Sequence, residues 1–251
     1  MRSVEDGTTA DGTTGGAAPA AVSPSSRAPD SSRESDRTAR ARIRDAAIDR
    51  FGQDGIAASS LRTIAADAGV SAALVVHHFG SKDGLRAACD DHVAATIREG
   101  KRQAMAAGPG ADPLVALRQA EETRPLLRYL ARVLVDPSPA VADLVDELVD
   151  DAEAYMAEGE RTGTLRPSAD PRGRAVVLTM WSLGALVLRE HVARLLGADL
   201  TADTQGLLAY SLPATELLGE GALTPEAYAR IRAAYEDLAS PGGHHHQEQR
   251  P

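Results

Sequence analysis

The chain has 251 residues, of which 43% are hydrophobic but only 3% aromatic, and its formal net charge is −9 at pH 7. Its single cysteine, Cys89, excludes an intramolecular disulfide, and the longest nearly uncharged run, residues 175–188, is shorter than the ~20 residues that a membrane span needs. Because alanine supplies much of the apolar content, the composition favours helices, and we expect a soluble, cytoplasmic, all-α protein.

The charge is distributed unevenly along the chain. Residues 37–102 contain eleven Lys or Arg against eight Asp or Glu, a net charge of +3, whereas residues 1–36 carry −3 and residues 103–251 carry −9. One basic segment in an otherwise acidic chain is typical of a protein in which one small part meets phosphate. The middle segment is therefore where we look for a nucleic-acid contact.

Both ends of the chain are predicted to be disordered tails. Residues 1–36 are rich in Gly, Ala, Ser, Thr, Pro and Asp, show no periodicity and lack the apolar run of a secretory signal. Residues 240–251, "SPGGHHHQEQRP", have the same character, and we interpret their three histidines as incidental rather than as a metal site.

Residues 37–51 predict a first helix, because apolar residues recur at helical spacing until Gly52. The stretch "SLRTIAADAGVSAALVVHHFGSKDGL", residues 60–85, then predicts two short helices and the start of a third. Ser59 or Ser60 is placed to cap a helix through Ala68, and Gly69 suits a left-handed turn. The next helix is expected from Ser71 to about residue 78.

The spacing within this stretch predicts a helix-turn-helix motif. Two helices that cross steeply through a short turn need a small residue where their backbones approach, glycine at the turn and a buried aliphatic residue on the second helix. Ala65, Gly69 and Val75 meet these requirements in order. The second helix of such a motif is the one that enters a DNA major groove.

The rest of the chain is predicted to be helical. Ser81 is placed to cap a long fourth helix, residues 81–107, and no strand alternation or internal repeat follows it. Pro213 is expected to kink or break the helix that contains it. The further predicted helices cover residues 113–122, 124–135, 139–159, 171–196, 204–218 and 224–238.

Residues 42–85 resemble the DNA-binding domain of the tetracycline-repressor (TetR) family of bacterial transcription regulators. The resemblance rests on Ile43, Ala46, Ala47 and Phe51 in the first helix, on "IA" at 64–65 and "AGVS" at 68–71, and on the "HHFGSK" run at 77–82. It implies a DNA-binding domain over residues 37–85, followed by a helical ligand-binding and dimerisation domain over residues 86–239.

The resemblance also implies which side chains contact DNA. The end of the recognition helix and the lysine after it would contact phosphates, and Arg62 would read a guanine edge. Alanine methyl groups at the groove floor would meet thymine methyl groups. The candidate DNA-binding residues are Arg40, Arg42, Ser60, Arg62, Ser71, Ala72, Ala73, His77, His78 and Lys82.

Other interpretations of these residues remain open. His77 and His78 as metal ligands are disfavoured, because adjacent helical residues point about 100° apart. Arg62 and His77 also fit a plain solvated helix surface. The family often has tyrosine where this chain has Val76, which removes a hydroxyl contact to phosphate. Arginines at the start of the first helix would compensate through phosphate attraction.

By the resemblance, the large domain dimerises and holds a small molecule. Residues 171–196 and 204–218 are the expected dimer face, where Ser182, Gly184 and Ala185 would allow close helix approach, and Trp181 is expected to be buried near the domain centre. Packing inside the monomer is the alternative. The candidate pocket residues are Met105, Tyr129, Tyr155, Met156, Met180 and Trp181.

The sequence thus favours a homodimeric repressor that binds an inverted-repeat operator in double-stranded DNA and is released by an unidentified small molecule. The alternative is a helical ligand-binding or protein-interaction module without specific DNA recognition, which Val76 and the −9 charge of residues 103–251 support. No catalytic constellation and no cofactor motif is found in the large domain, so an enzyme is not expected.

Overall fold

The first helix, α1 (Ala28–Asp54), is longer than the sequence predicted. In the computed structural model, which describes residues 28–239, it begins at Ala28 rather than at residue 37, because no Pro or Gly interrupts the chain between Pro29 and Gly52. Residues 1–27 and 240–251, both predicted to be disordered, lie outside the described residues. The chain divides into two units, residues 1–38 and 39–251, and α1 contributes to both.

Three helices follow α1 at the spacing that the sequence predicted: α2 (Leu61–Asp67), α3 (Ala72–Phe79) and α4 (Lys82–Ala106). Each begins after a serine whose side chain accepts a hydrogen bond from a backbone N–H in the first turn. These serines are Ser60, Ser71 and Ser81. The expected caps are confirmed, and Ser59 is instead buried.

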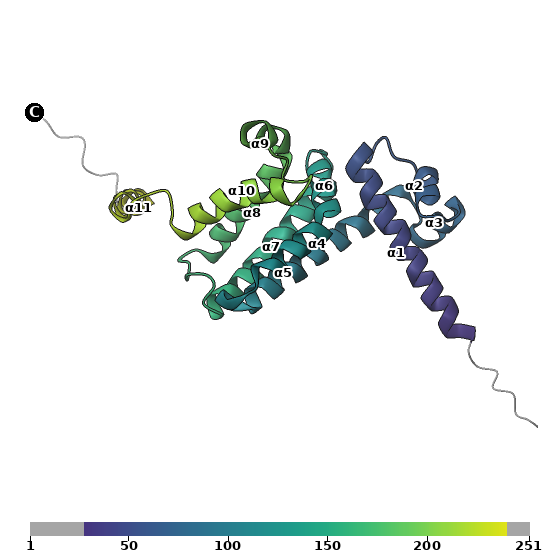
Figure 1. Ribbon diagram of the computed structural model, residues 1–251, viewed down its shortest axis with the longest axis horizontal. Coiled ribbons are helices and arrows are strands. Elements are labelled where there is room, and N and C mark those ends of the chain that lie inside the picture. Colours follow the sequence, from purple (N-terminus) through teal and green to yellow (C-terminus); the bar gives the residue numbers. More distant parts are fainter. Residues whose placement is uncertain (1–27, 240–251) are drawn as a thin grey trace, which may run out of the picture. The chain divides into compact units, whose positions relative to one another are not determined.

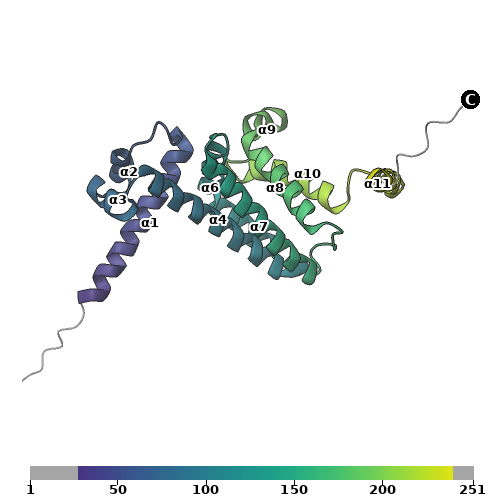
Figure 2. The same cartoon turned by 180° about the vertical axis from the view of Figure 1, so that it is seen from behind.

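The large domain is built from α4 and seven further helices among the described residues (Figure 1). They are α5 (Pro113–Glu122), α6 (Arg124–Val133), α7 (Pro139–Arg161), α8 (Pro171–Val187), α9 (Arg189–Leu196), α10 (Thr204–Gly219) and α11 (Pro225–Ala239), and a 3-10 turn, η1 (Gly108–Gly110), precedes α5. α7 packs between α4 and α8, as both views show (Figure 1, Figure 2). Residues 28–239 contain no strand, which confirms the all-α class.

One continuous apolar core runs from the DNA-binding helices into the large domain. Its largest fully buried side chains include Phe51 of α1, Ile64 of α2, Val75 of α3, Leu85 of α4 and Tyr129 of α6. Phe79, the last residue of α3, packs against this core. The four N-terminal helices and α6 are therefore linked by shared packing rather than by a flexible connection.

Two predictions about the C-terminal helices were wrong. The single helix expected over residues 171–196 is two, α8 and α9, which meet at Leu188 with a bend of 76°. Position 188 is a leucine rather than Gly or Pro, so the residue at the break gives no local signal for it. Conversely, α10 continues through Pro213, which was expected to kink or break it. Within residues 28–239 no single helix is long and apolar enough to cross a membrane, although α8 and α9 together pass that test as a bent pair.

Candidate nucleic-acid interface

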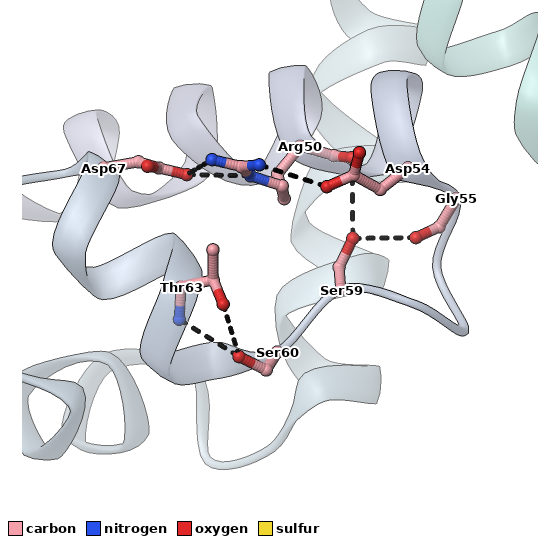
Figure 3. Close-up of polar contacts among 7 residues, drawn as sticks. All are labelled: Arg50, Asp54, Gly55, Ser59, Ser60, Thr63 and Asp67. Carbon is pink, nitrogen blue, oxygen red and sulfur yellow. Dashed lines mark hydrogen bonds and ion pairs between the residues drawn. The ribbon is translucent and has the colours of Figure 1, made fainter.

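The end of α1 is bound to α2 by a charged side-chain contact that the sequence did not predict. Arg50 of α1 donates hydrogen bonds from Nε and Nη2 to Asp67 of α2, at 2.9 and 2.6 Å, and from Nη1 to Asp54 at 3.1 Å (Figure 3). Both bonds to Asp67 converge on the same carboxylate oxygen, Oδ2, and are charge-assisted hydrogen bonds. This contact sets the angle at which α2 leaves α1.

The loop between α1 and α2 is closed by two polar side chains. The Ser59 hydroxyl donates to the carbonyl of Gly55 at 2.7 Å (Figure 3). Lys82, the first residue of α4, extends its ammonium group to the carbonyls of Ser59 and Ala57, at 2.5 and 3.3 Å. Lys82 is therefore part of the structure that positions α2 as well as a candidate phosphate contact.

The turn between α2 and α3 has the geometry that the motif requires. Gly69 has φ = +66°, a conformation that side chains with a Cβ rarely adopt. Arg42 of α1 donates from Nη2 to the carbonyl of Ala68 at 2.9 Å, which binds the turn to α1. Like Lys82, Arg42 already has a positioning contact, and its proposed attraction to phosphate adds to that role.

The outer face of the motif remains accessible. Val75 is fully buried and faces the core, whereas Val76, on the other side of α3, is 48% exposed. The remaining candidates are exposed or partly exposed around the start of α2 and along α3: Arg40, Ser60, Arg62, Ser71, Ala72, Ala73, His77 and His78. The structure thus places every side chain predicted to contact DNA at the surface or in a contact that orients the motif.

The aromatic end of α3 is packed rather than loose. The ring centroids of His77 and His78 lie 5.4 Å apart, and those of His78 and Phe79 lie 6.1 Å apart. The Arg40 guanidinium lies 5.2 Å from the centroid of the Phe79 ring, which holds the start of the motif against its end. Within residues 28–239 no group of three His, Cys, Asp or Glu side chains is arranged to hold a metal ion.

The six candidate pocket residues separate into three locations. Met156 is buried between α7 and α8, with Tyr155 packed beside it, and Met105 of α4 lies against Gly159 of the same helix α7. These three lie close enough in the fold to share one pocket wall, and that role remains a prediction. Tyr129 instead lies at the junction of α1, α4 and α6, fully buried.

Trp181 and Met180 are exposed, so the expectation that Trp181 is buried was wrong. Trp181 is 38% exposed and Met180 41% exposed, because both lie on the side of α8 that faces away from α7. A hydrogen bond from the Trp181 indole joins α8 to Tyr210 of α10; it lowers the pKa of that tyrosine, although burial has the larger, raising effect. The sequence could not show which face of α8 meets α7, since both faces are apolar.

The exposed side of α8 and α10 carries large apolar side chains. Val177, Trp181 and Gly184 recur at helical spacing along α8, and Leu212 of α10 is 66% exposed. Exposed apolar surface of this extent is typical of an interaction face. Its large exposed residues are Val176, Val177, Met180, Trp181, Leu208, Leu212, Leu217 and Leu218.

Comparisons with known proteins agree with this architecture. The family model "Bacterial regulatory proteins, tetR family" matches residues 43–89, and "Tetracyclin repressor-like, C-terminal domain" matches residues 121–224. The HTH-type transcriptional regulatory protein RaaS of Mycobacterium tuberculosis (strain ATCC 25618 / H37Rv) is 46% identical over 156 residues, 62% of this chain and 73% of that protein. A TetR-family transcriptional regulator from Rhodococcus sp. has a similar fold, with a TM-score of 0.55 at 19% identity over 72% of this chain and 98% of that one.

Proposed function

The chain belongs to the TetR family of bacterial transcription regulators, and from that membership we propose that it is a homodimeric repressor. It binds a palindromic operator through α3 and is released from DNA by a small molecule. Members of this family are regulators rather than enzymes, which agrees with the absence of catalytic motifs in the sequence of the large domain.

The accessible face of α3, on a rigidly positioned motif, is the observation that carries the proposal. Base readout requires a helix whose position is fixed to within a fraction of an ångström while its outer side chains stay free. Here the Arg50–Asp67 contact, the Arg42 contact to the turn and the Lys82 contact to the loop fix the motif. On this segment Val75 lies in the core and Ala72 packs against it, whereas Ser71, Ala73 and His77 are exposed and lie outside the core.

The exposed apolar face of α8 and α10 supports the homodimer. Two copies related by a two-fold axis would bury this face in a four-helix contact, in which each copy presents the same patch. A dimer carries two recognition helices, and two such helices read two half-sites of opposite orientation. The palindromic operator follows from this symmetry.

Selection of bound duplexes from a random DNA library tests the proposal. We expect an inverted repeat with half-site centres about 34–36 Å apart, or a multiple of that distance. The Arg62→Ala variant in a parallel selection serves as a control, because it should shift the preference at one base pair of each half-site. If no inverted repeat is enriched at moderate salt, the chain is an interaction module without specific DNA recognition.

The small molecule is expected to act through the large domain. It releases DNA only if its affinity is higher for the conformation that does not dock on DNA than for the conformation that does. Met105, Tyr155 and Met156, near the contact of α4 with α7, are the pocket candidates that the structure keeps together. A ligand there lies against α4, the helix that follows α3 directly.

A further inference from the structure

α6 touches the DNA-binding helices at a point of backbone contact. A Cβ atom on Gly52 of α1 would lie 3.2 Å from the backbone nitrogen of Tyr129, which is closer than Cβ atoms normally approach other heavy atoms. The rings of Phe51 and Tyr129 are 6.4 Å apart between centroids. Three residues further along, Gly55 lies against the side chain of Arg132. The last turn of α1 therefore rests directly on α6.

The same tyrosine is joined to α4 by a buried hydrogen bond. The Tyr129 hydroxyl donates to Asp90 Oδ1 at 2.6 Å, with Tyr129 fully buried and Asp90 8% exposed. The other oxygen of Asp90 lies 3.6 Å from Nε of Arg86, also on α4. Arg86 Nη1 donates at 3.3 Å to Asp136, just beyond the end of α6. We call Arg86, Asp90, Tyr129 and Asp136 the α4–α6 polar cluster.

This cluster buries charged groups whose pairing is incomplete. Burial raises the pKa of Asp90, and the hydrogen bond from Tyr129 and the charge of Arg86 offset this only in part. Burial next to Asp90 also raises the pKa of the Tyr129 hydroxyl. Nε and Nη2 of Arg86 have no hydrogen-bond partner among the described residues. Well-packed apolar residues often match or exceed the stability of such buried charges, so specificity of arrangement is the better reason for the cluster.

We infer that Tyr129 and Asp90 are positioning residues. Their hydrogen bond holds α6 against α4 and thereby determines the position of α1, α2 and α3. The inference rests on the proposed DNA-binding function. Only two residues, Gly80 and Ser81, separate α3 from α4, and Asp90 lies about 12 Å along α4 from Lys82, at 1.5 Å per residue. A shift of α6 relative to α4 is thus passed to the recognition helix within three turns.

The incomplete pairing of Arg86 gives the cluster a second arrangement. If α6 slides, Tyr129 leaves Asp90, and the carboxylate can then move closer to Nε of Arg86, now 3.6 Å from Oδ2, and to Nη2, which has no hydrogen-bond partner among the described residues. If every polar group of the cluster already had a hydrogen-bond partner, Asp90 could not exchange Tyr129 for a new partner on Arg86. Coupling between distant sites needs an element with two discrete arrangements, and the α4–α6 polar cluster supplies one at the junction of the two domains.

Tyr129→Phe tests the inference, with Tyr235→Phe on α11 as the control. Both remove one hydroxyl from a tyrosine of the large domain, but Tyr235 is 68% exposed and lies outside the α4–α6 polar cluster and the proposed pocket. Affinity for the selected operator and for an unrelated duplex is measured well below the melting temperature. We expect Tyr129→Phe to weaken operator binding at least about fivefold, the lower end of typical coupling, and to leave binding of the unrelated duplex unchanged.

A loss of operator binding without a loss of binding to the unrelated duplex distinguishes an effect on the position of the recognition helices from an effect on protein stability. Phosphate contacts, which carry binding to any duplex, stay intact, while the spacing of the two recognition helices no longer matches the operator. A purely structural role would lower the melting temperature and leave the affinity of the folded protein unchanged. Equal operator affinity of the two variants, or an equal loss on both duplexes, would overturn the inference.

Hydrogen exchange followed by mass spectrometry gives a readout without DNA. In Tyr129→Phe, amides of α6 and of the last turn of α1 should exchange faster than in the wild type and in Tyr235→Phe, while those of α7 stay unchanged. Unchanged exchange in α6 would overturn the inference. Faster exchange in a protein whose wild type selects no operator would support the contact and overturn the proposed function instead.

Discussion

At the scale of single residues, the positions predicted to contact DNA have two kinds of role. Arg62, Ser71, Ala73 and His77 are exposed and make no contact that the motif needs beyond the Ser71 cap. Arg42 and Lys82 hydrogen-bond backbone carbonyls of neighbouring segments. The resemblance to the TetR family pointed to these positions, but the positioning contacts depend on chain segments 23 to 26 residues apart. No local pattern encodes them.

Two substitutions at this scale should have different effects on DNA binding. Arg62→Ala should cost about 1–3 kcal/mol and relax the preference at one base pair of each half-site, because it removes a base-edge contact. Lys82→Ala should weaken binding to all duplexes alike. It should also reduce the steepness of the plot of log binding constant against log salt concentration by about one. Competition binding against single-base operator variants at several salt concentrations measures both. Identical behaviour of the two variants would contradict the division into reading and positioning residues.

At the scale of helices, most of the element order was predictable and the contacts between elements were not. The caps Ser60, Ser71 and Ser81 and the turn at Gly69 are local signals, and the structure uses all four. The break at Leu188 has no local signal. Gly52 was read as a helix stop, yet α1 continues to Asp54, and the glycine serves the approach of α6 instead.

Gly52→Ala should therefore destabilise the protein, although alanine is the better helix former. The new Cβ would press on the backbone of Tyr129 at 3.2 Å, and a helix backbone cannot move aside as a side chain does. We expect a loss of about 1–3 kcal/mol in the free energy of unfolding.

Gly100→Ala in α4 is the control, because nothing lies within 4 Å of its added Cβ. It should stabilise by up to about 1 kcal/mol through helix propensity. Urea unfolding of both variants measures the difference. A stabilised Gly52→Ala would show that α6 yields easily at this contact.

Leu212→Glu on α10 should weaken the dimer, because it places a charge at the centre of the proposed four-helix contact. Leu114→Glu on α5 is the matched control: the two leucines are 66% and 65% exposed, so neither change should unfold the monomer. Sedimentation of both variants over a range of concentrations distinguishes them. A dimer as stable in Leu212→Glu as in Leu114→Glu would move the interface to another face.

At the scale of the whole molecule, the exposure of Trp181 turns the sole tryptophan into a reporter of assembly. If α8 and α10 form the dimer face, dilution should shift Trp181 emission to longer wavelength as the ring becomes hydrated. The midpoint should coincide with the dissociation measured by sedimentation. In Leu212→Glu the emission should already be at the long-wavelength limit. An emission maximum that is independent of concentration would place Trp181 outside the dimer contact.

The sequence alone determined the helix class, the helix-turn-helix and its caps, because these depend on residues within a few positions of one another. It also determined the family resemblance through the motif in residues 42–85. Only the tertiary structure decided which face of α8 is exposed, that Tyr129 of α6 contacts α1 and hydrogen-bonds α4, and that Lys82 and Arg42 hold the motif. These outcomes depend on which helices meet, and helices that are apolar on several sides can pack in several ways.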